Sequence, residues 1–287
     1  TPREDWLVPN LLPAHLANAL YPWVTPNESL RLFLTLILLN LALAFLLCCR
    51  EFNRSRNLIF LGLPFFWGGM TGLGLINYIG IYPLLLYALP LARMVAREGR
   101  KRDSLALVFV TVLAFFMHGV GFLFVLGLSG LSFLIALPER RVAWRFLTLV
   151  PSLAIWLFWF LSGPLSSPGP GGLTSATERM RTQSISAKLS AFPSDALDVL
   201  VGTADEIALI LLLLTLTAWF LGQKHRRAPY SSKLDFLRDR PVLVLCSTAI
   251  LSVLVMPTYV GTILIDTRMI TPSIMILCIL PRPLVSR

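Results

Sequence analysis

Residues 93–102 read Arg-Met-Val-Ala-Arg-Glu-Gly-Arg-Lys-Arg, a short basic run between two long apolar stretches. Short loops with an excess of Lys and Arg stay on the cytoplasmic side of a membrane. If all the basic runs share that side, an even number of crossings separates consecutive runs, and the remaining polar segments face outward. Four other runs have this character: Arg50, Arg54 and Arg56; Arg140, Arg141 and Arg145; Lys224, Arg226, Arg227, Lys233, Arg238 and Arg240; and Arg282 and Arg287.

The composition indicates a polytopic membrane protein. Of the 287 residues, 56% are hydrophobic and 14% are charged, whereas soluble domains average about 45–50% and about 25%. The formal net charge of +10 lies mainly in the linkers, so it indicates topology signals and contacts with membrane lipids and argues against nucleic-acid binding. The four cysteines form no CxxC pair and have no histidine at ligand spacing, so no disulfide or metal site is predicted.

The pattern predicts an all-α transmembrane helical bundle with about nine crossings. Residues 1–28, rich in proline, form an outer N-terminal segment with interfacial helices. Residues 29–162 form a first transmembrane part, which begins with a span at 29–49. Residues 163–205 form an outer, periplasmic loop that contains an amphipathic helix near 174–191. Residues 206–287 form a C-terminal transmembrane part that turns outside near 257–268.

Two stretches between basic runs are too long for one crossing, so each is predicted to be a hairpin of short helices. In residues 58–92 the break should fall in the glycine-rich stretch 68–74, and in residues 104–137 near His118-Gly119-Val120-Gly121. Irregular backbone at membrane depth must be covered by protein or line a cavity. These two breaks are therefore the places to look for a binding site.

The same topology predicts an outer N-terminus and a cytoplasmic C-terminus, in a membrane such as the bacterial inner membrane. Because the chain starts Thr1-Pro2 without a signal-peptide pattern, at least one further span is expected before residue 1.

His118 and the pair Asn77-Tyr78 are the polar candidates in the hairpins. An ionisable group inside a membrane is by default a functional candidate, so His118 is predicted either to meet substrate or a proton, or to bond a backbone carbonyl at the glycine turn. Asn77 and Tyr78 are suited to bind a sugar hydroxyl, or alternatively to hold helices together.

Asp266 and Arg268 lie at the outer turn of the last hairpin. A guanidinium binds two phosphate oxygens at once, which favours Arg268 as a phosphate ligand; the alternative is an ion pair with Asp266. Glu4 and Asp5 face outward in the predicted topology. Either carboxylate is a candidate general base, the alternative being a solvated terminus.

Three of these places together resemble the GT-C glycosyltransferases: Phe65-Phe66-Trp67-Gly68-Gly69-Met70-Thr71-Gly72-Leu73-Gly74-Leu75-Ile76-Asn77-Tyr78-Ile79-Gly80, the His118-Gly119 hairpin, and Asp266-Thr267-Arg268 before a final span. The resemblance implies a polytopic helical enzyme that takes a sugar from a polyprenyl-phosphate donor on the outer side of the membrane. It also implies an acidic general base in the first outer loop, for which Glu4 and Asp5 are the candidates here. By the same resemblance, Arg268 would meet the donor phosphate and His118 would lie near the sugar.

Three functions follow as hypotheses. The first is such a glycosyltransferase, with a polyprenyl-phosphate-linked sugar as donor. The second is a non-catalytic subunit that binds other membrane subunits, because a fold does not fix a function. The third is a transporter, since helices broken at membrane depth are a transporter device, although no internal repeat relates the two halves.

Overall fold

The computed structural model describes residues 9–67, 76–137, 140–162, 180–196, 207, 210–215, 240–260, 263–264 and 266–281. In these ranges the regular structure is helical apart from three two-residue strands. Four helices are long and apolar enough to cross a membrane, and two further apolar helices, Pro241–Val255 and Arg268–Cys278, are shorter. The predicted helical class is confirmed, and the apolar helices are compatible with a membrane protein. The four long helices are Pro26–Glu51, Ile76–Glu98, Gly119–Ala136 and Ala143–Ser162.

The N-terminal part consists of α1 (Leu12–Leu20) and α2 (Pro26–Glu51). Thr25 caps α2: its hydroxyl accepts a hydrogen bond from the Glu28 N–H, and the Glu28 carboxylate accepts the Thr25 N–H at 2.8 Å. This reciprocal pair satisfies two backbone donors that the first helical turn leaves free. The helix therefore begins at Pro26, three residues before the predicted start of the span at residue 29, because Thr25 is its cap.

The predicted glycine-rich break, residues 68–74, lies outside the described part of the chain. Trp67 ends the first series of short helices, and Ile76 begins the next. Gly99, in the left-handed region at φ 66°, ends the second series, as is common after a helix C-terminus. The elements are η1 (Arg56–Leu58), α3 (Ile59–Gly62), η2 (Leu63–Trp67), α5 (Ile76–Ile79) and α6 (Ile81–Glu98).

The second predicted break is present at His118, between α7 (Lys101–Met117) and α8 (Gly119–Ala136). As predicted for this stretch, both helices are short for a membrane crossing. The two helices have 17 and 18 residues, which correspond to roughly 26 and 27 Å. The chain leaves the helical conformation at His118, whose backbone is extended (φ −164°, ψ 119°), whereas the glycines that follow lie inside α8.

After α8, the described residues form five helices and a three-stranded antiparallel sheet in the order β1-β2-β3. The loop helix begins at Ile185, so the predicted range 174–191 is wrong at its start. Met180 and Arg181 pair instead with Val260 and Tyr259 in the sheet. The last turn lies between α14 and α15, as predicted. The elements are η3 (Arg140–Leu149), α9 (Val150–Ser162), β1 (Met180–Arg181), α11 (Ile185–Ala196), α14 (Pro241–Val255), β2 (Tyr259–Val260), β3 (Ile263–Leu264) and α15 (Asp266–Cys278).

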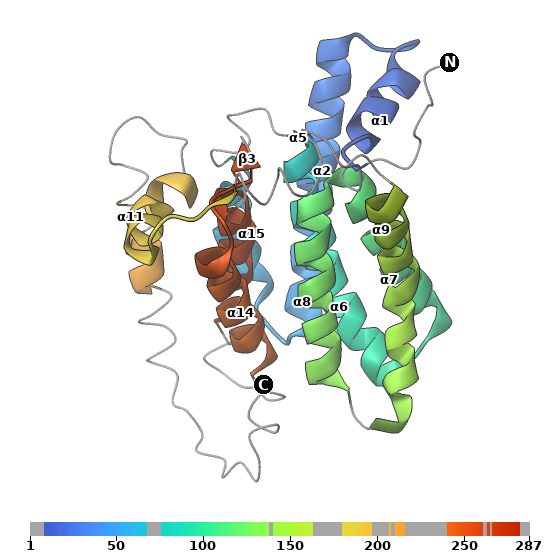
Figure 1. Cartoon of the computed structure of the whole chain (residues 1–287), viewed down its shortest axis with the longest axis vertical. Helices are drawn as coiled ribbons and strands as arrows, with labels where there is room; N and C mark the ends of the chain where they lie inside the picture. The colour runs from blue at the N-terminus through green and yellow to red at the C-terminus, as the bar shows by residue number, and fades with distance from the viewer. Residues whose placement is uncertain are drawn as a thin grey trace.

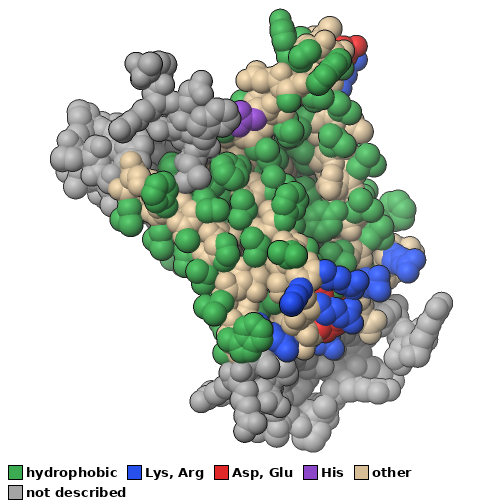
Figure 2. Space-filling view, turned by 90° about the vertical axis from the view of Figure 1, so that its right-hand side faces the viewer, with side chains coloured by type: hydrophobic (Ala, Val, Ile, Leu, Met, Phe, Trp, Pro, Cys, Tyr) green, Lys and Arg blue, Asp and Glu red, His purple; other side chains and the backbone are tan. Residues whose placement is uncertain are grey.

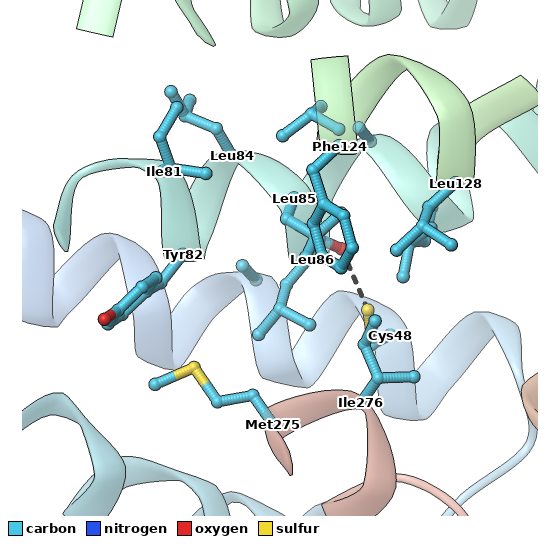
Figure 3. Packing of buried hydrophobic residues seen from close by; sticks show 14 of the residues in the cluster. Cys48, Ile81, Tyr82, Leu84, Leu85, Leu86, Phe124, Leu128, Met275 and Ile276 are labelled. Atoms are coloured by element: carbon cyan, nitrogen blue, oxygen red, sulfur yellow. Dashed lines mark hydrogen bonds between the residues drawn. The ribbon is translucent and has the colours of Figure 1, made fainter. Parts of the chain in front are cut away.

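Helix α6 is the centre of the bundle and packs against α2, α7 and α8 (Figure 1). It carries Pro90, which has no N–H to donate to the carbonyl of Leu86 one turn earlier. The thiol of Cys48 on α2 donates to that carbonyl instead, with a sulfur–oxygen distance of 2.8 Å (Figure 3). The buried thiol of Cys48 therefore supplies a donor in place of the one that the proline lacks.

The charged and apolar side chains are separated along the bundle. Figure 2 shows a broad apolar surface with Lys and Arg side chains gathered at one end of it. Glu51, at the end of α2, pairs with Arg93 at 3.1 Å and with Arg97 at 3.4 Å. Residues 99–100 connect α6 to α7 at this end, so His118, at the other end of a 17-residue helix, lies about 26 Å away.

Candidate functional site

A cavity of about 290 Å³ lies at the end of the bundle that is opposite to the basic side chains. Figure 1 shows α5 and the sheet that precedes α15 at this same end. Four of the seven predicted site residues line the cavity, although they come from three separate parts of the sequence. The lining residues are Asn10, Pro13, Ile76, Asn77, Tyr78, His118 and Arg268.

His118 begins α8 and is buried, with 8% of its surface exposed. Its Nδ1 accepts a hydrogen bond from the Gly121 N–H at 3.1 Å, so the side chain caps the helix by satisfying one of its free backbone donors. At the glycine turn the hydrogen bond thus runs from the backbone N–H to His118, which is the reverse of the direction in the sequence alternative. Its Nε2 lies 3.2 Å from Nη1 of Arg268.

The protonation state of His118 decides whether its Nε2 is a donor or an acceptor toward Arg268. His118 lies in the connection between α7 and α8, where burial, and secondarily the charge of Arg268, lower its pKa to about 4. The ring is therefore neutral at pH 7. Because Nδ1 accepts a hydrogen bond, the single ring proton resides on Nε2.

The Nε2–H of His118 and the guanidinium of Arg268 are then two hydrogen-bond donors 3.2 Å apart. Arginine has no acceptor atom, so neither group satisfies the other. Two donors that converge on one place need a common acceptor, and a negatively charged oxygen is the strongest. The start of α8 adds partial positive charge at the same place.

Tyr78 fixes the position of Arg268. Its hydroxyl donates to the backbone carbonyl of Arg268. That carbonyl is available because Pro272, four residues further along α15, has no N–H to donate to it. The Tyr78 ring also packs edge-on against His118, with ring centroids 5.2 Å apart. Tyr78 thus contacts both donor residues, and its hydroxyl is engaged in holding α15.

Asn77 connects the cavity to the N-terminal segment. Its Nδ2 donates to the carbonyl of Asn10 at 3.1 Å. Asn10 has φ 74°, the left-handed region that asparagine tolerates better than most residues. Next to it, Pro9 is buried against Gly119 at the start of α8. Asn77 therefore holds one wall of the cavity in place.

Arg268 is half-buried and lines the cavity. Among the side chains that the structure describes, no carboxylate lies within 4.0 Å of it, since the described ion pairs involve Glu51, Glu98 and Asp103. Its Nε is buried and has no hydrogen-bond partner among the described residues. The guanidinium thus retains donors for a ligand.

The other three predicted site residues are not placed. Asp266 is the first residue of α15, but its side chain is outside the described set, and Glu4 and Asp5 lie outside the described residues. Sequence reasoning missed Asn10, Pro13 and Ile76 as lining residues. The proline density of residues 1–28 indicated only an irregular segment, and nothing in it pointed to a contact with α8.

An apolar groove of about 260 Å³ lies against α1, which lines it with Leu12 and Leu16. Met117 lines the groove, and the next residue, His118, lines the polar cavity. The groove runs between α1, α2, α6 and α7 and is lined by Leu12, Leu16, Phe33, Leu36, Ile37, Asn40, Gly80, Pro83, Leu84, Tyr87, Leu113 and Met117.

In the described part of the chain no three His, Cys, Asp or Glu residues are grouped so that they could hold a metal ion. Comparisons with known proteins add no relative: no family model, no curated protein and no solved structure matches this chain.

Proposed function

We propose that this chain is an integral membrane protein of the glycosyltransferase type, which binds the phosphate of a polyprenyl-phosphate-linked sugar at His118 and Arg268. The observation that supports this most strongly is the convergence of two hydrogen-bond donors, 3.2 Å apart, on a cavity whose described lining contains no carboxylate. A phosphate presents several negatively charged acceptor oxygens to such a pair.

The surroundings of the cavity fit an amphiphilic donor. A phosphate held by His118 and Arg268 leaves the attached sugar in the 290 Å³ cavity beside Asn77. The apolar groove that Met117 lines offers a place for the lipid chain. In this proposal Asp266 completes the binding site, and Glu4 or Asp5 acts as the general base that deprotonates the acceptor.

The proposal includes nine crossings, an N-terminus outside and a C-terminus in the cytoplasm, in the bacterial inner membrane. Basic side chains lie at one end of α7 and the cavity lies at the other. This arrangement supports the proposed orientation, because positive loops stay cytoplasmic. The donor site would then lie near the outer surface.

A non-catalytic subunit of a larger membrane complex is the second candidate. The span Ala143–Ser162 is only 11% buried, so it presents a long apolar surface to lipid or to another membrane chain. Such a subunit could keep the anion site as a structural lipid site without a general base.

The test uses the full chain in lipid nanodiscs and a radiolabelled polyprenyl-phosphate hexose. Arg268→Ala should weaken donor binding at least about tenfold, since it removes charge-assisted bonds worth about 1.5–3 kcal/mol each, and should abolish sugar transfer. Arg31→Ala, which removes an exposed arginine on α2, is the control and should change neither. Equal binding by both variants would refute the site. Donor binding without transfer, together with stoichiometric partner chains in native mass spectrometry, would favour the subunit.

A further inference from the structure

One wall of the polar cavity is a stiff segment, residues Pro9 to Pro13, called here the wall segment. Asn10 and Pro13 line the cavity. Proline fixes φ at both ends of the segment, and Pro13 already belongs to the first turn of α1. The segment therefore has few ways to yield when a ligand enters.

Two contacts place the wall segment on the rest of the site. Asn77 donates from its side-chain amide to the carbonyl of Asn10 at 3.1 Å. Pro9 lies over Gly119, where a Cβ would be 3.2 Å from the Cβ of Pro9 and 3.3 Å from its Cγ. The distance from the wall segment to His118 and Arg268 thus depends on the hydrogen bond from the Asn77 side chain and on the absence of a side chain at Gly119.

We propose that the wall segment, seated on Gly119 and tied by Asn77, limits the size of the group attached to the bound phosphate. The inference rests on the proposed phosphate site. The cavity, at about 290 Å³, is at the lower end of the range for ligand pockets, about 300–1,000 Å³. It therefore suits one sugar ring, and Asn77 acts as a positioning residue that selects a monosaccharide phosphate over larger ones.

Gly119→Ala tests the inference, because the added methyl group would lie 3.2 Å from the Cβ of Pro9, so Pro9 must move by a few tenths of an ångström. Gly127→Ala is a matched control on the same helix, where nothing lies within 4 Å of the added Cβ. Asn77→Leu is a second variant that releases the wall segment without touching α8. Binding of inorganic phosphate, a hexose 1-phosphate and a disaccharide 1-phosphate is measured for the full chain in nanodiscs at a single pH.

We expect Gly119→Ala and Asn77→Leu each to raise the affinity for the disaccharide phosphate, relative to the hexose phosphate, by about fivefold or more. In Gly119→Ala, inorganic phosphate should bind within about twofold of the original protein, since His118 and Arg268 are unchanged. Unchanged selectivity in both variants, with phosphate binding intact, would overturn the role of the wall segment alone. Failure of the original chain to bind any of the three phosphates would overturn the proposed function itself.

Discussion

Lowering the pH from 7 to 5 should tighten the binding of an anionic ligand, because His118 lies where the anion would bind. Burial and the charge of Arg268 lower the pKa of His118 to about 4 in the free protein. A bound phosphate stabilises the charged ring and raises that pKa. The complex then holds more protons than the free protein between the two pKa values, so its affinity rises as the pH falls through this window.

The size of the effect follows from the geometry. Nε2 of His118 lies 3.2 Å from Nη1 of Arg268, so an oxygen bound by both would be in direct contact with the ring. An opposite charge at that distance raises a histidine pKa by about 1–3 units. With a rise of about 2 units, the affinity at pH 5 would be about tenfold higher than at pH 7.

Isothermal titration calorimetry on the chain in nanodiscs measures this effect. A phosphodiester is the right ligand because, unlike a phosphate monoester, it has no second ionisation near pH 6. His118→Asn should remove the pH dependence and keep α8 intact, since asparagine is a strong helix cap. His15→Asn is the control and should retain the full effect. A flat affinity between pH 5 and 7 in the original chain, or the same slope in His118→Asn, would refute the two-donor site.

Four other substitutions test the supports of the site, the core and the anchoring of α11. Tyr78→Phe removes the bond to the Arg268 carbonyl, worth about 0.5–1.5 kcal/mol, and should weaken phosphodiester binding up to about tenfold in the same calorimetric assay. Pro272→Ala supplies an N–H that competes with Tyr78 for that carbonyl, so it should also weaken phosphodiester binding. Pro90→Ala in α6 is the control and should leave this binding unchanged. Gly62→Ala places a methyl group against the Phe45 ring and should lower the free energy of unfolding by about 1–3 kcal/mol; the open position Gly127 should tolerate the same change in a thermal melt. Lys188→Met removes the donor that binds the Val253 carbonyl at 3.1 Å and the Met256 carbonyl, so residues 182–190 should be cleaved faster by a non-specific protease, and unchanged cleavage would mean that this lysine does not anchor α11.

Local sequence signals predicted much of the secondary structure. The hydrophobic run after Thr25 predicted α2, and the interruption at His118-Gly119 predicted the division between α7 and α8. Such signals act between neighbours in the chain, so they can be recognised without the fold. The start of the loop helix at Ile185 was missed because Met180 and Arg181 pair with a strand almost eighty residues away.

The sequence by itself determined the class of this protein, since the length and composition of its apolar runs leave a helical membrane bundle as the stable arrangement. It also identified Asn77, Tyr78, His118 and Arg268 as the rare polar groups of an apolar chain. Only the tertiary structure decided that these four share one cavity, because His118 and Arg268 are 150 residues apart. The fold likewise determined the role of each residue. The Tyr78 hydroxyl donates to the Arg268 carbonyl, which Pro272 leaves without a helical partner. The Nδ1 of His118 accepts the Gly121 N–H at the start of α8, so Nε2 is the donor beside Arg268.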